Sequence, residues 1–141
     1  MTEATLPPER LARLERAIEA VPYARLLGIQ LEKVGSGEAT LTLAIRPELS
    51  QNHGVVHGGA IASLIDTATA FAILTLLEPE EKVTTVDLTI SYLRPAFEGM
   101  LEATAKVLRK GRRLYSVSAE VTDTSGSLLA TALSTYIKLQ P

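Results

Sequence analysis

The sequence contains no cysteine among its 141 residues, which excludes disulfides, thiolate metal sites, iron–sulfur clusters and cysteine nucleophiles. Aromatic residues make up only 4%, so the composition gives no indication of a pocket for an aryl group. Neither charge is in excess, since 14 Lys and Arg stand against 16 Asp and Glu. A nucleic-acid-binding protein would usually be basic, so that class is disfavoured. The length suits one domain.

No segment at the N-terminus has the basic and apolar regions of a secretory signal, so a cytoplasmic location is expected. The one long apolar stretch, residues 60–77, has the threshold length for a membrane span. It contains Asp66 and several hydroxyl side chains, and acidic rather than basic residues follow it. A carboxylate within a span is costly in lipid, so we predict a helix buried in protein and no membrane partner.

A short amphipathic helix is predicted at the N-terminus. Two prolines, which suit the first turn of a helix, precede apolar residues at helical spacing, and Pro22 ends the pattern. The apolar positions are Leu11, Leu14, Ile18 and Val21. Residues 1–22 are therefore predicted to form a helical extension, and residues 23–141 a single domain that starts with one more short turn.

The rest of the chain combines strand patterns with the one apolar helix. Strands are predicted at residues 29–34, 39–45, 82–93, 100–109, 112–122 and 128–139. After the helix, Val86, Leu88, Ile90 and Tyr92 alternate with polar residues, as on an antiparallel strand with one buried face. Only a curled sheet can cover such a helix. The predicted fold class is therefore α+β, with a long central helix wrapped by a curled antiparallel sheet of about six strands.

Asp66 is the only carboxylate in the apolar helix. Its neighbours three and four residues away are all small, namely Ala62, Ser63, Thr69 and Ala70. Buried carboxylates are rare without a partner, and no basic residue lies nearby in the sequence. Two interpretations stay open at this point: a buried Asp satisfied by a backbone amide or by Ser63, or a catalytic carboxylate in a cleft.

His57, Gly58 and Gly59 stand at the start of that helix. The first N–H groups of a helix have no partner within it, and glycines leave them open to a ligand oxygen. With the positive end of the helix dipole, this pattern suits an oxyanion hole; a tight turn that merely needs glycine is the alternative. A metal pair of His53 and His57 is disfavoured, because the intervening glycine argues against a regular helix and no third ligand is evident.

Four basic residues lie within five positions between two predicted strands: Arg109, Lys110, Arg112 and Arg113. Arginine side chains match the geometry of phosphate oxygens, so this cluster indicates either a phosphate site or a solvated hairpin. The chain lacks the G-x-S-x-G elbow, the Walker A motif and G-x-G-x-x-G. Without a cysteine or a serine elbow, hydrolysis would have to depend on the carboxylate.

Together these residues resemble the signature of acyl-CoA thioesterases with the hot-dog fold. Residues 51–59 and Asp66 match the phenylacetate-degradation (PaaI-like) pattern: Asn or Gln, two residues, Gly, two residues, His-Gly-Gly, then Asp or Glu nine residues after the His. Residues 86–95 and 111–113 also resemble segments of the family. The resemblance covers residues 23–139 and implies a hot-dog fold, here with an extra N-terminal helix.

The resemblance implies a role for each matching residue. The Gly58 N–H would polarise the thioester carbonyl, and Asp66 would act as nucleophile or as general base on water. Gln51 would position the water or the substrate, and His57 would help to hold the loop and touch the thioester.

Three further positions follow from the same resemblance. A hydroxyl on the strand after the helix would orient the water; Thr84 and Thr85 compete for that role, and alignment favours Thr85. Gly59, Arg112 and Arg113 stand where the family contacts coenzyme A. No metal and no organic cofactor would be needed.

The implied reaction is hydrolysis of an acyl-CoA thioester to a free acid and coenzyme A. One alternative is a hot-dog protein that binds acyl-CoA without hydrolysing it, as a ligand sensor does. Another is a hot-dog dehydratase or hydratase, whose proline-rich motif is absent from the sequence. Intact Asp66 and Gln51 favour the enzyme.

The spacing of the two central roles indicates a site shared between two chains. Gly58 and Asp66 are eight residues apart, which is about 12 Å along a helix axis. A short Asp side chain cannot bridge that distance to one thioester. A second, antiparallel copy of the helix would bring Gly58 of one chain beside Asp66 of the other. A homodimer is therefore the expected minimal unit, and the resemblance implies a homotetramer, a dimer of dimers.

Overall fold

The structure, a computed structural model, describes residues 5–140. Helices α1 (Pro8–Ala20) and α2 (Pro22–Leu27) lead into strands β1 (Gln30–Gly35) and β2 (Glu38–Ala44). A short 3-10 helix, η1 (Pro47–Leu49), precedes the central helix α3 (Gly58–Leu74). Strands β3 (Val83–Tyr92), β4 (Met100–Lys110), β5 (Leu114–Thr122) and β6 (Leu128–Lys138) follow.

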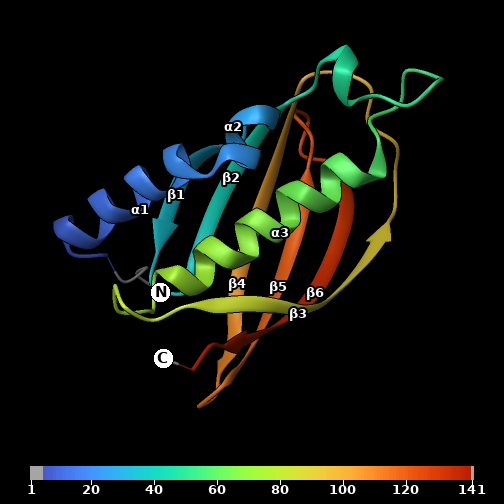
Figure 1. The fold of residues 1–141 in the computed structure, drawn as a ribbon. Coiled ribbons are helices and arrows are strands. Elements are labelled where there is room, and N and C mark those ends of the chain that lie inside the picture. The colour runs from blue at the N-terminus through green and yellow to red at the C-terminus, as the bar shows by residue number, and fades with distance from the viewer. Residues whose placement is uncertain (1–4, 141) are drawn as a thin grey trace.

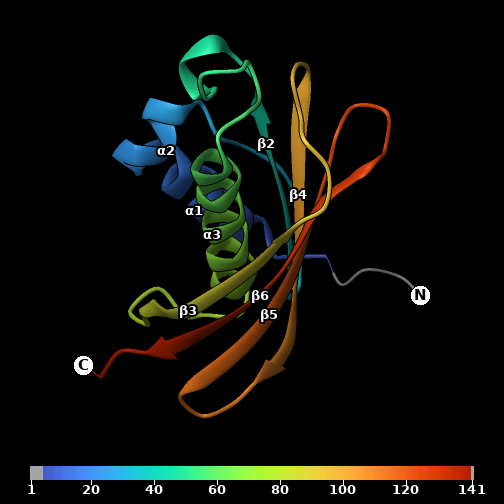
Figure 2. The ribbon, with the colours of Figure 1, turned by 90° about the vertical axis from the view of Figure 1, so that its right-hand side faces the viewer.

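The strands form one antiparallel six-stranded sheet in the order β1–β2–β4–β5–β6–β3. Helix α3 lies across one side of this sheet, with α1 and α2 on the same side (Figure 1). Turned by 90°, the view shows the sheet curling around α3, with β3 crossing beside the helix (Figure 2). The predicted α+β architecture, a central helix wrapped by a curled antiparallel sheet, is confirmed.

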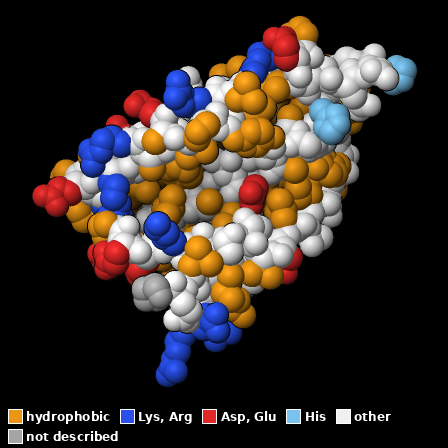
Figure 3. All heavy atoms as spheres, in the orientation of Figure 1, with side chains coloured by type: hydrophobic (Ala, Val, Ile, Leu, Met, Phe, Trp, Pro, Cys, Tyr) orange, Lys and Arg blue, Asp and Glu red, His pale blue; other side chains and the backbone are white. Residues whose placement is uncertain are grey.

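Helix α3 is buried on the sides that face the sheet. Leu64, Ile65 and Ile73 are fully buried, and the helix packs on β2, β4 and β5, whose inner faces carry side chains such as Leu41 and Leu101. Burying one side chain of this size contributes about 1.5–3 kcal/mol. The remaining stripe of the helix is only partly buried and carries Ala62, Ser63, Asp66, Thr67 and Ala70. Figure 3 views this side of the molecule, where hydrophobic and uncharged side chains dominate around the helix.

The predicted bounds of this helix, residues 60–77, are shifted in the structure. The helix starts at Gly58 because the His57 side chain caps it. It ends at Leu74 because the Thr75 hydroxyl donates to the Ala72 carbonyl at 2.7 Å and accepts from the Gly37 N–H at 2.7 Å, which turns the chain. Within residues 5–140, no helix has both the length and the apolar character that a membrane crossing requires.

Three cationic side chains bond the segment that directly follows α3. Arg10, Lys110 and Arg13 donate to the carbonyls of residues 75, 76 and 77, at 2.8, 3.3 and 2.9 Å. Helix α1 and the end of β4 therefore both fix the position of the central helix.

Strand β5 begins at Leu114, so the predicted start at residue 112 is wrong. The Gly111 N–H donates to the Leu114 carbonyl at 2.8 Å and closes a tight turn. A Cβ on Gly111 would lie 2.7 Å from that same oxygen, so glycine is required there. Arg112 and Arg113 consequently stand exposed in the turn rather than on the strand.

The N-terminal helix ends at Ala20, before Pro22 as expected, and the predicted further turn is α2, which Pro22 opens. Leu14 and Ile18 belong to the same hydrophobic core as α3. The division into an extension at 1–22 and a domain at 23–141 stays a prediction. Residues 1–4, which entered the prediction of no secretory signal, and residue 141 lie outside the described residues.

Candidate active site

Asp66 lies in the middle of α3 on its partly buried stripe. Its Oδ1 accepts a hydrogen bond from the Thr85 hydroxyl at 2.9 Å and lies 3.1 Å from the Tyr136 hydroxyl. The Ser63 hydroxyl donates instead to the Gly59 carbonyl, at 2.8 Å. No hydrogen bond within residues 5–140 reaches the other carboxylate oxygen, Oδ2, so that oxygen is available to water or substrate.

A β-bulge aims Thr85 at this carboxylate. Strict alternation from Ile90 would place Val86 and Thr84 on the inner face of β3. The register with β6 shifts between residues 85 and 87, and Val86 is left 54% exposed, contrary to the predicted buried position. Thr85 therefore occupies the inner face and reaches Asp66, which Thr84 does not.

Tyr136 is a neighbour of Asp66 that the sequence analysis missed. Its hydroxyl lies 2.8 Å from the Asp66 carbonyl and 2.8 Å from the hydroxyl of the buried Thr69. Burial raises the pKa of Tyr136 above its ordinary value of 10.0, and the negative charge of Asp66 adds to the rise. The register of β6 could have revealed it, because Tyr136 shares the inner face with Ala132 and Ser134, whose small side chains leave room for a phenol.

The N-terminal end of α3 carries the predicted oxyanion donor. Gly58 is the first residue of the helix, and its carbonyl accepts a hydrogen bond from the Tyr92 hydroxyl at 2.8 Å. The Gly59 N–H donates to His57 Nδ1, also at 2.8 Å. The Gly59 N–H is thus occupied, whereas the Gly58 N–H makes no hydrogen bond within residues 5–140 and stays open. Tyr92 is 52% exposed, although the alternation predicted burial, because β3 ends beside the open loop.

Gln51 and Gly58 line one hollow of about 290 Å³ between the loop that follows η1 and the end of β3. A hydrogen bond from the Gln51 N–H to the Val55 carbonyl, 2.8 Å long, closes that loop. Asp66 is not among the residues that line this hollow, and it lies about 12 Å further along the helix axis. One chain therefore presents two separate halves of the predicted site, an amide end with Gln51 and a carboxylate end with Thr85.

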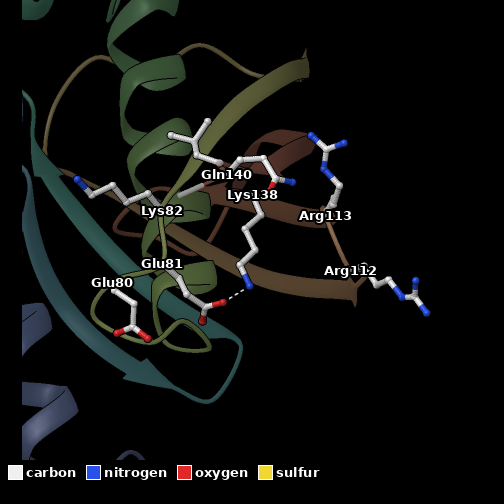
Figure 4. Close-up of a pocket in the computed structure, with 8 residues that line it drawn as sticks. Glu80, Glu81, Lys82, Arg112, Arg113, Lys138 and Gln140 are labelled. Carbon is white, nitrogen blue, oxygen red and sulfur yellow. Dashed lines mark ion pairs between the residues drawn. The ribbon is translucent and has the colours of Figure 1, made fainter.

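Arg112 and Arg113 line a larger hollow, of about 610 Å³, together with Lys82 and Lys138 (Figure 4). Lys138 forms an ion pair with Glu81, and both arginine side chains project away from that pair (Figure 4). The Lys138 N–H donates to the Arg113 carbonyl at 2.7 Å, which ties the turn to the end of β6. Among residues 5–140, His, Cys, Asp and Glu form no group of three that could hold a metal ion.

Comparison with known proteins identifies the family. The family model described as "Thioesterase superfamily" matches residues 53–130, which include α3 and strands β3 to β5. The chain belongs to the thioesterase superfamily.

Relatives that match nearly all of the described chain extend this result beyond residues 53–130. The medium/long-chain acyl-CoA thioesterase YigI of Salmonella typhimurium is 28% identical, over 95% of this chain and 97% of its own. The structure of the Escherichia coli PaaI protein, from the phenylacetic acid degradation operon, superimposes with a TM-score of 0.85 and 26% identity, covering 94% of this chain and 95% of that one. A thioesterase family protein from Silicibacter pomeroyi gives a TM-score of 0.86 and 26% identity, over 94% and 99% of the two chains.

These similarities confirm the hot-dog fold and the PaaI-like assignment. Thioester hydrolysis is the activity of this family and of this chain. The individual site residues stay predictions, argued below from their geometry.

The thioesterase should lose stability in alkali through Tyr136. Because its pKa is raised in the folded state, the unfolded chain releases this proton first as the pH rises above 10.0. The stability that Tyr136 contributes is thus fully present below that pH and declines above it. We expect Tyr136→Phe to reduce the fall in unfolding free energy between pH 10 and 11 by about 1 kcal/mol per pH unit. Urea unfolding across this range measures it, and parallel curves for both proteins would contradict the assignment.

Proposed function

We propose that this thioesterase hydrolyses acyl-CoA thioesters to a free acid and coenzyme A, with Asp66 as nucleophile or general base. The supporting observation is the Asp66 carboxylate on a helix stripe that has no other charged residue. Thr85 bonds its Oδ1, and its Oδ2 is open. Such an oxygen can attack the thioester carbon or take a proton from a water that does so. Thr85 would fix the carboxylate and orient the water.

The Gly58 N–H would stabilise the negative charge that develops on the thioester oxygen. It stands at the positive end of the α3 dipole, where an open amide is most effective. Gln51, in the same hollow, would position the water or the substrate, and His57 would hold the loop through its bond to Gly59. This mechanism uses a carboxylate, water and an amide, so it requires neither a metal nor an organic cofactor.

The proposed active unit is a homodimer with two shared sites, and a homotetramer, a dimer of dimers, stays a prediction. The separation of Gly58 and Asp66 along one straight helix supports the dimer. The open stripe of α3 also supports it, since Ala62 and Ser63 would let an antiparallel copy approach closely. Each site would then combine the amide end of one chain with the carboxylate end of the other.

Arg112, Arg113 and Gly59 are the proposed contacts of the coenzyme A moiety. The two guanidinium groups are exposed at a turn and point away from the Glu81–Lys138 ion pair, so they are free to meet phosphate oxygens. This turn is hydrogen-bonded to the end of β6, and the same strand carries Tyr136, whose hydroxyl lies beside Asp66.

Asp66→Asn should abolish turnover while substrate still binds. The amide keeps the shape of the side chain and loses the charge that attacks or takes a proton. We expect kcat to fall about 10²-fold or more, as for removal of an acid–base group, with little change in binding. A panel of acyl-CoAs with a free-thiol readout measures kcat, and calorimetry measures binding. Near-normal turnover would exclude Asp66 from the mechanism and would favour a different hydrolytic site.

Mixed dimers should regain activity from two inactive chains. One chain carries Asp66→Asn, and the other carries Gln51→Ala with Gly58→Pro. Proline suits the first helical position and removes its N–H, so the helix start is retained without the donor. After joint unfolding and refolding, equal amounts should give about a quarter of the wild-type rate, since half the dimers are mixed and each has one intact site. If mixed dimers form, as shown by differently tagged chains, and the mixture stays inactive, the shared site is wrong.

Replacing Arg112 and Arg113 with Ala should raise KM far more than it lowers kcat, because phosphate contacts are the same in ground and transition states. The dependence of KM on salt should also weaken. The control is Arg16→Ala with Lys106→Ala, which removes the same charge from outside the hollow. Equal effects of the two double variants would assign the arginines to general surface charge.

A further inference from the structure

The first turn of α3 combines two opposing requirements. Glycine at the start leaves amides open to a ligand, as an oxyanion donor needs. Glycine is also the residue with the most backbone freedom, so a helix that begins with two glycines frays most easily. An amide that stabilises a transition state must be held in place before the reaction, since reorientation during the reaction would cost part of its effect.

Two side chains hold the peptide unit between these glycines from opposite ends. The Tyr92 hydroxyl donates to its carbonyl, on Gly58, at 2.8 Å. Its N–H, on Gly59, donates to His57 Nδ1 at 2.8 Å. Because Nδ1 accepts this bond, the neutral His57 ring carries its proton on Nε2. The peptide next to the open Gly58 N–H is therefore fixed at both its polar atoms.

Close approach explains why both positions are glycine. A Cβ on Gly58 would lie 3.3 Å from the Tyr92 ring, and a Cβ on Gly59 would lie 2.9 Å from His57 Nδ1. A Cβ on Gly59 would force His57 to move, and a Cβ on Gly58 would require the Tyr92 ring to shift by a few tenths of an ångström. The glycines thus admit the two holding side chains as well as a ligand.

The position of Tyr92 does not suit a core residue. Its side chain is 52% exposed at the end of the edge strand β3, and it lines the same hollow as Gln51 and Gly58. An exposed aromatic ring that donates a hydrogen bond to the helix start contributes more to local geometry than to burial.

We propose that Tyr92 is a positioning residue that orients the Gly58 N–H toward the thioester oxygen. Its hydroxyl acts through the Gly58 carbonyl and does not itself touch the reacting atoms. This inference rests on the proposed function, in which Gly58 is the oxyanion donor.

Tyr92→Phe tests the proposal, because it keeps the ring against Gly58 and removes only the hydroxyl. Loss of a whole oxyanion donor costs about 10²–10³ in kcat, so loosening one should cost about tenfold, with KM within about twofold. Tyr23→Phe is the matched control. Tyr23 is 54% exposed, and its hydroxyl lies 2.9 Å from the Ser63 hydroxyl on the same helix, one turn away from the donor. We expect Tyr23→Phe to keep the wild-type kcat.

A second measurement reports on the donor itself. The measurement uses the Asp66→Asn variant, which prevents turnover, with a bound acyl-CoA that carries ¹³C at the thioester carbonyl. Infrared difference spectra then give the frequency of that carbonyl. Binding should lower that frequency, and Tyr92→Phe should reverse part of the shift while Tyr23→Phe leaves it unchanged. An unchanged kcat and carbonyl frequency in Tyr92→Phe, or equal losses in both tyrosine variants, would overturn the inference. In either case the proposed function would stand as long as the wild type hydrolyses acyl-CoA and Asp66→Asn does not. A wild type without activity on any acyl-CoA would overturn both.

Discussion

The central helix needs cover on most of its circumference but must keep one stripe open. Helix α3 is apolar around most of its circumference, so the sheet has to curl around it. Strands β2, β4 and β5 supply the side chains that cover it. The remaining side carries the small residues and Asp66. The two ends of the helix carry further contacts. The structure fixes them with His57 at one end and with Arg10, Lys110 and Arg13 at the other.

Because α3 is fixed and straight, its Gly58 amide and its Asp66 carboxylate stay apart. A straight α3 cannot bring its first amide and its middle carboxylate to one substrate, because bending it would open the core that covers it. The distance between Gly58 and Asp66 is thus a consequence of how the helix is buried. In the proposed dimer, a second helix would lie against the stripe of small residues and bring the two halves together.

Periodicity in the sequence was sufficient for the architecture, because apolar spacing in α1, α3 and the strands follows the face that each element buries. Motif positions were sufficient to propose Asp66, Gly58 and Gln51 as site residues, and those roles stay predictions. Features set by pairing with another strand were not predictable in this way. The tight turn that places Arg112 and Arg113 off the strand depends on one carbonyl contact of Gly111, and the phenol of Tyr136 meets Asp66 only through the register of β6. The Gly111 contact leaves no periodic trace in the sequence, and the alternation of β6 places Tyr136 on the inner face without showing that its phenol meets Asp66.

Strand β3 shows how one irregularity can serve both halves of the proposed site. It runs antiparallel to α3, so its first half lies beside Asp66 and its last residue beside Gly58. In a regular strand, Thr85 and Tyr92 would point to opposite faces, because they are seven positions apart and side chains alternate from one position to the next. The bulge at Val86 adds one residue between them and turns both toward the helix. The bulge leaves the apolar side chain of Val86 exposed to solvent. Strand β3 can hold a bulge because it lies at the edge of the sheet, where only β6 has to follow the change in register.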